Sequence, residues 1–447
     1  MEIAYNPLDI CTRSYDEFTV LYDLRNRQIL QLENVSADIW NFIIKQNPTT
    51  ADKISAYISN EYACSIEDVS DDIIGFLQDL YDSGIIQFNG QYIDINTDNP
   101  IKENNNSFQD TDDFEGQIIT SLEEKNQLYS ATLEMTYSCN EKCIHCYAHY
   151  PSVDTSSDYL SMFQYKEFLD SLLDLGALHL AFTGGDPFMN KNFIELFKYS
   201  RLKGFVSDIF TNGLWLSDHP NQLQEIIELR PRAFYISLYG ASPNVHDSIT
   251  CIPGSFDKTI SVVKTIHAAE IPVVFNVMLL KENYDDFKNI IALAKNLDVE
   301  YRVGMSLIYR NDGSDSPMAH FINDKEKIKN VLRTIRTKVY SADRPVDDAP
   351  SNSDFMCEAG VTSICLSPDG TVYPCVSLKT PLGNIVQSTL EDIWNGSSRL
   401  NLINSLKWKN TKECNSCQYK SDCPHCAGMS QAESGDPFSC NTCDRML

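Results

Sequence analysis

The stretch that decides the fold reads Cys139-Asn-Glu-Lys-Cys143-Ile-His-Cys146-Tyr147 and directly follows an apolar, strand-like run, residues 132–135. Its cysteines are spaced C-x3-C-x2-C. A structural zinc site takes four protein ligands, and the spacing dictates no fourth ligand nearby. Three thiolates suit a four-iron, four-sulfur cluster in which one iron stays open for a substrate or cofactor. The alternative is three structural thiols, or a zinc knuckle completed by His145 or His149.

Beyond this loop, apolar runs alternate with amphipathic stretches as far as residue 308. The apolar runs cover residues 178–183, 206–210, 233–239, 272–279 and 301–308. Such alternation is typical of βα units and predicts an α/β fold with a parallel sheet. At least six strands in about 180 residues favour a partial (β/α)6 barrel over a closed eight-stranded one.

With Tyr147, the cysteine loop resembles the signature of radical S-adenosylmethionine (radical SAM) enzymes. The resemblance implies that the cluster reduces S-adenosylmethionine by one electron, and that the 5′-deoxyadenosyl radical formed takes a hydrogen atom from the substrate. The resemblance also implies which parts of the chain bind S-adenosylmethionine. A glycine-glycine-acid-proline turn would bind the methionyl amino group, and residues at strand ends would contact the ribose or the carboxylate. Apolar residues later in the chain would contact the adenine. The matching positions are Tyr147, Gly184, Gly185, Asp186, Pro187, Thr211, Asn212, Ser237, Asn276, Met305 and Leu307.

Two of these positions depart from the usual pattern of the family. Most members carry Glu where this chain has Asp186, and Tyr239 replaces a usual Asp two residues after Ser237. Read without the family, Gly-Gly-Asp-Pro is only a turn that ends a strand.

Nine cysteines stand in the final hundred residues, where the only regular pattern is a hairpin around Pro368-Asp369-Gly370. We therefore expect metal binding rather than apolar burial to organise this end. The run C-x2-C-x5-C-x2-C from Cys414 to Cys426 is similar to the SPASM extension of radical SAM enzymes, which holds auxiliary four-iron clusters. A pair of zinc sites would fit the same spacing.

The resemblance implies two auxiliary clusters, and hence three [4Fe-4S] clusters in all. It assigns Cys357, Cys375 and Cys426 to the first auxiliary cluster, and Cys414, Cys417, Cys423 and Cys443 to the second. Cys440 is an alternative to Cys443. A fourth ligand of the first auxiliary cluster would be Cys365 or Cys440, or else one iron stays open; Cys365 could equally be a buried strand residue.

Residues 1–92 predict a small α+β domain. Residues 17–23 and 28–33 read as a β-hairpin, and three helices follow, of which the third repeats apolar residues from Val69 to Leu80 and ends before Gly84. We expect a winged helix-turn-helix. Its third helix is rich in Asp and Glu, which argues against binding in a DNA groove. The segment resembles the leader-recognition domains of enzymes that mature ribosomally synthesised and post-translationally modified peptides (RiPPs).

The other expectations follow from length, charge and composition. The 447 residues divide into this domain, an acidic linker (93–130), a radical SAM partial barrel (131–310), a bridge (311–350) and a SPASM domain (351–447). The net charge of −26 excludes nucleic acid and anionic membranes as partners. The sequence carries no long apolar span and no signal-peptide pattern, so we expect a cytoplasmic protein.

Together these features predict an enzyme that binds the leader of a precursor peptide. It would form a thioether from a cysteine sulfur to a carbon in the core peptide, as sactipeptide and ranthipeptide maturases do. A flavodoxin or ferredoxin would supply electrons. The alternatives are carbon–carbon cross-linking or another peptide oxidation by the same apparatus, and a non-catalytic leader-binding scaffold with structural clusters.

Overall fold

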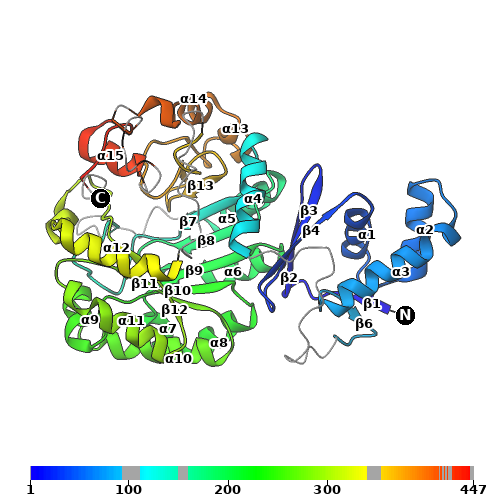
Figure 1. Ribbon diagram of the computed structural model, residues 1–447, viewed down its shortest axis with the longest axis horizontal. Coiled ribbons are helices and arrows are strands. Elements are labelled where there is room, and N and C mark those ends of the chain that lie inside the picture. Colours follow the sequence, from blue (N-terminus) through cyan, green and yellow to red (C-terminus); the bar gives the residue numbers. More distant parts are fainter. Residues whose placement is uncertain are drawn as a thin grey trace. The chain divides into compact units, whose positions relative to one another are not determined.

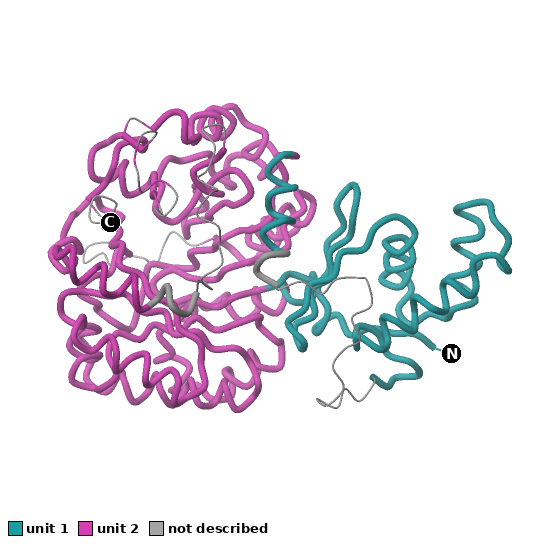
Figure 2. Tube along the Cα trace, viewed as in Figure 1, with its two compact units in different colours: residues 1–124, 200–206 teal, residues 125–199, 207–447 magenta. Residues whose placement is uncertain are grey.

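The computed structural model describes residues 2–92, 111–148, 160–339, 354–411, 413–414, 417, 420 and 425–442. The chain forms two compact units (Figure 2). Unit 1 comprises residues 1–124 with 200–206, and unit 2 comprises residues 125–199 with 207–447. No helix among the described residues combines the length and the apolar character that a membrane crossing needs.

Unit 1 contains the expected hairpin as part of a three-stranded antiparallel sheet in the order β2-β3-β4. Its strands are β2 (Ile10–Ser14), β3 (Phe18–Asp23) and β4 (Gln28–Glu33). The three expected helices follow as α1 (Asn34–Lys45), α2 (Ala51–Glu61) and α3 (Ile66–Asp82). A second small sheet joins β1 (Glu2–Ala4), β5 (Thr49–Thr50) and β6 (Gln87–Phe88). The winged helix-turn-helix arrangement stays a prediction.

One apolar core ties the sheet of unit 1 to its helices. Leu21 on β3 and Leu32 on β4 belong to this core, and Trp40, Ile73 and Leu77 join it from α1 and α3. The buried indole of Trp40 donates a hydrogen bond to Thr12 Oγ1 at 3.1 Å. The alternation of core and non-core residues along β4 leaves its other side chains on the opposite face of the sheet.

Part of the expected linker is a helix. Helix α4 spans Thr111–Glu124, and Ile118 and Leu122 on it are buried. These two residues are four apart, so they lie on one helix face that packs against protein. The acidic composition of residues 94–125 masked this short apolar stripe. Residues 93–110 lie outside the described part of the chain.

Unit 2 is built on a nine-stranded sheet in the order β12-β11-β10-β9-β8-β7-β13-β14-β15 (Figure 1). Six parallel strands follow one another as β7 (Ser130–Glu134), β8 (His179–Thr183), β9 (Val206–Thr211), β10 (Ala233–Ser237), β11 (Val273–Met278) and β12 (Glu300–Gly304). β7 and β12 are not paired with each other, so the sheet forms a partial barrel, as expected. β12 ends at Gly304, so Met305 and Leu307 follow the strand rather than belong to it.

Helices connect these strands and cover one face of the sheet. They are α5 (Met162–Asp174), α6 (Phe193–Leu202), α7 (Leu214–Asp218), α8 (Pro220–Glu228), α9 (Pro243–Thr250), α10 (Ser255–Ala268) and α11 (Phe287–Asn296). Phe182, Ile209, Phe234 and Phe275 point to the covered face and are fully buried. Their strand neighbours Phe210, Tyr235 and Asn276 are only half-buried, so the other face is the more open one.

The cysteine-rich end extends the barrel sheet, which the sequence did not predict. β13 (Ser363–Leu366) pairs in parallel with β7, and β14 (Thr371–Tyr373) and β15 (Gly383–Asn384) continue the sheet. The remaining helices are α12 (Lys325–Val339), α13 (Leu390–Trp394), α14 (Ser397–Ser405) and α15 (Ala427–Ser434). Leu406, Trp408 and Ala427 form an apolar cluster here, so apolar burial also organises this end, contrary to expectation.

Candidate functional site

The cysteine loop leaves the carboxyl end of β7 and is held in place by backbone hydrogen bonds. Lys142 N donates to Thr250 O at 2.9 Å, and Ile144 N donates to Ile249 O at 3.0 Å. Both acceptors lie at the end of α9. Backbone hydrogen bonds to α9 therefore help to position the loop between Cys139 and Cys146.

The three thiols of this loop are neighbours in a buried environment. Cys139 Sγ accepts from Glu141 N at 3.4 Å, and Cys143 Sγ donates to Glu141 Oε2 at 3.2 Å. Burial raises the pKa of Cys139 and of Cys143, and the neighbouring charge of Cys146 raises both further. Thiols held together in this way need a metal to become thiolates.

The donor set fits an iron–sulfur cluster better than a single ion. Among the residues described, no three His, Cys, Asp or Glu side chains converge on one ion position. A four-iron cube presents its irons at separate corners, so its thiolates need not converge. The ring of His145 instead packs edge-on against that of Tyr239, with 4.6 Å between the ring centres. Burial lowers the pKa of His145 to about 4. His149 lies outside the described residues.

The Gly-Gly-Asp-Pro turn packs directly on the backbone before the first cysteine. Gly184 has a φ of +131°, and a Cβ there would lie 2.2 Å from Thr136 O. A Cβ on Gly185 would lie 2.2 Å from Ser138 O. Only glycine allows this approach, in which Asp186 N donates to Ser138 O at 3.0 Å.

The carboxylate of Asp186 points into the protein and joins two strand ends. It is fully buried and accepts hydrogen bonds from Thr211 Oγ1 at 2.6 Å, Asn212 N at 3.1 Å and Phe188 N at 3.1 Å. Burial raises the pKa of Asp186, and these three donors oppose that rise. Pro187 begins the short 3-10 helix Pro187–Met189. Asp186 therefore braces the turn.

Asn212 connects the turn at Asp186 to the cysteine loop by hydrogen bonds. Its Nδ2 donates to Asn140 Oδ1 at 2.7 Å and lies 3.6 Å from Cys139 Sγ. Its backbone oxygen accepts from Thr259 Oγ1 at 2.8 Å. The ends of the second and third strands therefore lie against the residues around the first cysteine.

The other expected cofactor contacts are more scattered. Leu307 is buried in an apolar cluster against which Met305, Cys143 and Ile144 also pack, so these residues lie near the cysteine loop. Ser237 ends β10 and hydrogen-bonds to Tyr239.

Asn276 and Tyr147 are engaged by other residues. Asn276 Oδ1 accepts from Arg302 Nε at 3.0 Å. The hydroxyl of Tyr147 donates to Glu134 Oε1 at 3.0 Å. Each side chain therefore has a partner within the protein.

A buried carboxylate that the sequence analysis missed lies beside the cysteine loop. Glu134 ends β7 and accepts from Tyr147, from Tyr137 at 3.1 Å and from Lys379 Nζ at 3.0 Å. Cys365 Sγ lies 3.9 Å from the same carboxylate, in the interior of β13. Burial, the largest single influence, lowers the pKa of Lys379, but the charges of Glu134 and Cys365 and the hydrogen bond to Glu134 together raise it above its ordinary value. Glu134 thus links the loop that carries Cys146 to the segment after Cys375.

Three of the expected auxiliary ligands lie close together. Burial raises the pKa of Cys357, and the charges of Cys375 and Cys426 raise it further, which places the three thiols within electrostatic reach. Cys414 is buried in the cluster against which Cys375 packs, and its backbone oxygen accepts from Cys417 N at 3.1 Å. Cys440 is half-buried, with Sγ 3.8 Å from Asn441 O. Cys423 and Cys443 lie outside the described residues.

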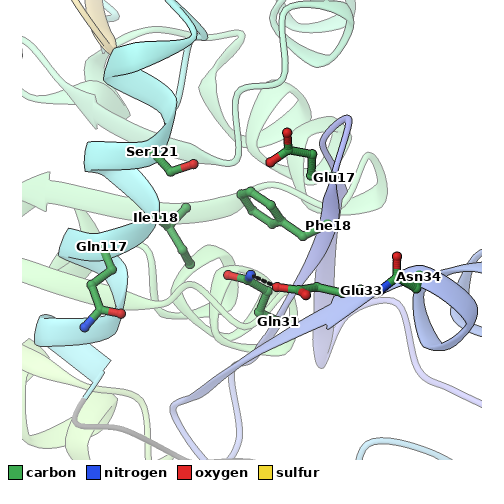
Figure 3. A pocket seen from close by; sticks show the side chains of 8 residues that line it. All are labelled: Glu17, Phe18, Gln31, Glu33, Asn34, Gln117, Ile118 and Ser121. Atoms are coloured by element: carbon green, nitrogen blue, oxygen red, sulfur yellow. Dashed lines mark hydrogen bonds between the residues drawn. The ribbon is translucent and has the colours of Figure 1, made fainter.

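Unit 1 has its own pocket, of about 430 Å³, between the hairpin and α4 (Figure 3). Phe18 and Ile118 form its apolar walls, and its polar lining consists of Glu17, Gln31, Glu33, Asn34, Gln117 and Ser121. Gln31 Nε2 donates to Glu33 Oε1 at 2.7 Å within it. The pocket thus combines carboxylates with an apolar wall.

Comparison with known families finds three matches along the chain. Residues 133–294 match the radical SAM superfamily, and residues 357–418 match SPASM, an iron–sulfur cluster-binding domain. Residues 19–86 match coenzyme PQQ synthesis protein D (PqqD). The first two matches imply iron–sulfur clusters and S-adenosylmethionine, whose chemistry is the one-electron generation of a radical.

Individual proteins show the same likeness. An AdoMet-dependent heme synthase from Methanosarcina barkeri is 26% identical over 68% of this chain and 92% of its own. A PqqA peptide cyclase from Rhizobium meliloti is 22% identical over 68% of this chain and 83% of its own. The crystal structure of Streptococcus suis SuiB bound to precursor peptide SuiA covers 98% of both chains at 14% identity with a TM-score of 0.59. The chain is therefore an enzyme with a radical SAM domain, a SPASM domain and a PqqD-like domain.

Proposed function

We propose that this enzyme binds the leader of a ribosomal precursor peptide on unit 1 and cross-links the core peptide oxidatively at the open face of the barrel sheet. The observation that carries the proposal is the presence, in one chain, of a PqqD-like unit with an unpaired strand edge and a radical SAM barrel joined to a cysteine-rich end. The PqqA peptide cyclase and SuiB with its bound precursor peptide support it.

The strand edge that would receive the leader is β4. Within the described residues β4 pairs only with β3, so its outer edge has no strand partner. Backbone hydrogen bonds would supply affinity, and side-chain pockets would set the register. The carboxylates of Glu17 and Glu33 in the neighbouring pocket would favour a basic side chain in the leader.

The S-adenosylmethionine site would lie where the turn at Gly184 and Gly185 meets the cysteine loop. Cys139, Cys143 and Cys146 would hold the cluster with one open iron. The backbone of the turn would orient the methionyl group, and Met305 and Leu307 would pack against the adenine. The hydrogen bonds among Asp186, Thr211 and Asn212 would hold the turn and the cysteine loop in fixed positions.

Replacing Asp186 with alanine is expected to weaken S-adenosylmethionine binding by about 10- to 100-fold, because the turn loses two buried hydrogen bonds to the end of the next strand and one to its own Phe188 N. Asp186→Glu, the residue common in the family, should bind within a few-fold of the wild type. Equilibrium dialysis with the anaerobically reconstituted protein measures the Kd. Asp218→Ala, which removes an exposed partner of Lys258, is the matched control. An unchanged Kd for Asp186→Ala would reject the bracing role.

The cysteine-rich end would hold two auxiliary [4Fe-4S] clusters. Cys357, Cys375 and Cys426 would bind the first, and Cys414, Cys417, Cys423 and Cys443 the second. Cys365 or Cys440 would complete the first cube, unless its fourth iron is left for a substrate. Iron and sulfide analysis of variants with Cys365 or Cys440 replaced distinguishes these arrangements, because only a ligand's loss lowers the iron content.

We favour a thioether as the bond formed, because an auxiliary cluster with an open iron can hold a cysteine thiolate of the substrate. S-adenosylmethionine held in the barrel would supply the radical that takes a hydrogen atom from a carbon, and the auxiliary cluster would accept the electron left over when the thiolate forms the sulfur–carbon bond. A carbon–carbon cross-link is the second candidate, which the likeness to the PqqA peptide cyclase favours. Electrons would come from a flavodoxin or ferredoxin.

Mass spectrometry of a co-expressed peptide tests this proposal. The peptide to be expressed with the full-length enzyme is the product of a small open reading frame sought beside the gene. A thioether is expected to remove two hydrogen atoms and to leave one cysteine resistant to iodoacetamide. A dehydrogenated peptide whose cysteines all alkylate would indicate the carbon–carbon link instead. An unmodified peptide would reject the proposed function.

A further inference from the structure

The open face of the barrel sheet carries an arginine that no part of the proposed chemistry uses. Arg302 on β12 pairs in register with Asn276 on β11, and Asn276 pairs with Ser237 on β10. Paired residues of neighbouring strands point to the same face. Tyr235, two residues before Ser237, and its partner Phe210 therefore share that face with Arg302. Arg302 thus lies on the side of the sheet that the connecting helices leave open.

The guanidinium group of Arg302 is held on three sides. Its Nε donates to Asn276 Oδ1 at 3.0 Å, and its Cζ lies 4.6 Å from the ring centre of Tyr235 and 5.1 Å from that of Phe210. The two rings stack on each other at 4.5 Å with an angle of 7°. Aromatic stacking and one hydrogen bond fix the plane of the group. Within the described residues, neither terminal nitrogen of Arg302 has a hydrogen bond or an ion pair.

Asp208, a carboxylate whose charge acts on Arg302, is already engaged. Asp208 lies deeper on β9 and is held by Arg232, whose Nε is 2.9 Å from Asp208 Oδ1 and whose second contact is to Oδ2. Asp208 therefore does not neutralise Arg302. A planar guanidinium with two free terminal nitrogens matches the two oxygens of a carboxylate.

Phe210 and Tyr235 lie before the ends of their strands, whereas the cysteine loop and the Gly-Gly-Asp-Pro turn follow strand ends. Arg302 itself pairs in register with Asn276, and Asn276 pairs with Ser237, so the guanidinium lies beside two of the expected S-adenosylmethionine contacts. The net charge of the chain is −26, so most of its surface repels anionic groups. The fixed positive charge of Arg302 would therefore favour a substrate whose anionic group reaches this position.

We propose that Arg302, on the shelf made by Tyr235 and Phe210, binds a carboxylate of the core peptide and thereby sets which residue of that peptide faces the radical. The carboxylate is that of an Asp or Glu side chain. This proposal rests on the proposed peptide-modifying function. The methionyl group of S-adenosylmethionine also carries a carboxylate, and the experiment separates the two sources.

The first test measures the modification of Arg302 by phenylglyoxal in the full-length reconstituted protein, followed by mass spectrometry of proteolytic fragments. The probe acetyl-Gly-Glu-Gly-amide is expected to slow the modification of Arg302 at least about threefold, since it covers the terminal nitrogens. Acetyl-Gly-Gln-Gly-amide should not slow it. Arg232, which is held by Asp208, is the internal reference. Protection by S-adenosylmethionine alone, equal protection by both peptides, or no protection would each overturn the proposal.

The second test uses variants with the co-expressed precursor peptide. Arg302→Gln is expected to lower the yield of modified peptide per 5′-deoxyadenosine by about 10-fold or more, the equivalent of one charge-assisted hydrogen-bond pair. Arg302→Lys should recover part of it, because lysine keeps the charge but not the planar fork. Lys264→Gln, which removes an exposed cation on α10, is the control. A normal yield in Arg302→Gln, or a matching loss of S-adenosylmethionine affinity, would contradict the proposal.

The two tests keep the proposal separate from the proposed function. If the wild-type enzyme modifies no peptide, the proposed function fails, and the phenylglyoxal experiment still decides whether Arg302 binds a carboxylate. If the wild type modifies its peptide but Arg302→Gln does so equally well, the carboxylate subsite alone is rejected. Thermal midpoints of the variants establish that each is folded.

Discussion

Replacing Cys143 with alanine is expected to abolish the formation of 5′-deoxyadenosine, by at least about a thousandfold, because a cluster that depends on three thiolates cannot lose one of them. Cys143 is half-buried on a loop that backbone hydrogen bonds to α9 hold in place. The loop should therefore keep its fold while losing the metal. The product is measured by liquid chromatography after anaerobic reduction, and the iron content should fall by about four atoms per chain.

Measuring peptide binding beside peptide modification in Cys143→Ala distinguishes an enzyme from a non-catalytic leader-binding scaffold. The leader would bind on unit 1, so the affinity of Cys143→Ala for the precursor peptide should stay within about twofold of the wild type. Cys251→Ala, which changes an exposed thiol at the end of α9, is the control and should keep both activities. Peptide modification that survives in Cys143→Ala would reject the radical mechanism.

Replacing Glu134 with alanine is expected to destabilise the protein by about 3–5 kcal/mol, because it leaves the ammonium group of Lys379 and two tyrosine hydroxyls without their shared acceptor. The side chain of Glu134 is fully buried and that of Lys379 is 29% exposed. Truncating one partner of such a pair costs more than removing both charges together. The double variant Glu134→Gln with Lys379→Met should therefore lose less stability than Glu134→Ala.

Urea unfolding followed by tryptophan fluorescence measures these differences. Lys166→Met is the matched control, since Lys166 also pairs with a carboxylate, that of Glu195 at 2.7 Å, but at the surface. Loss of that pair should cost less than about 1 kcal/mol. A loss for Glu134→Ala no larger than for Lys166→Met would show that the buried pair does not support the fold.

Local patterns in the sequence predicted the parts that local physics controls. Strands β7–β12 follow the apolar runs to within a few residues, because burial on the helix-covered face requires apolar side chains there. The C-x3-C-x2-C spacing placed three thiols on one loop. The two glycines before Asp186 marked a turn where a Cβ would collide with the backbone.

These local patterns could not predict contacts between residues that are far apart in the chain. Helix α4 was read as linker because two buried residues, Ile118 and Leu122, are too few to stand out in an acidic segment. Cys365 was weighed as a cluster ligand without its neighbour Glu134, which lies 231 residues earlier. The pair of Glu134 with Lys379 spans 245 residues. Asn276 was assigned to the cofactor without its partner Arg302.

The sequence by itself determined the kind of chemistry and the barrel that supports it, because ligand spacing and apolar periodicity act over a few residues. Only the tertiary structure decided that β13 pairs with β7, that Glu134 joins the two cysteine-rich segments, and that Arg302 lies on an aromatic shelf. These contacts depend on which strands become neighbours and which faces stay open. That choice minimises the free energy of the whole chain, so no short segment encodes it.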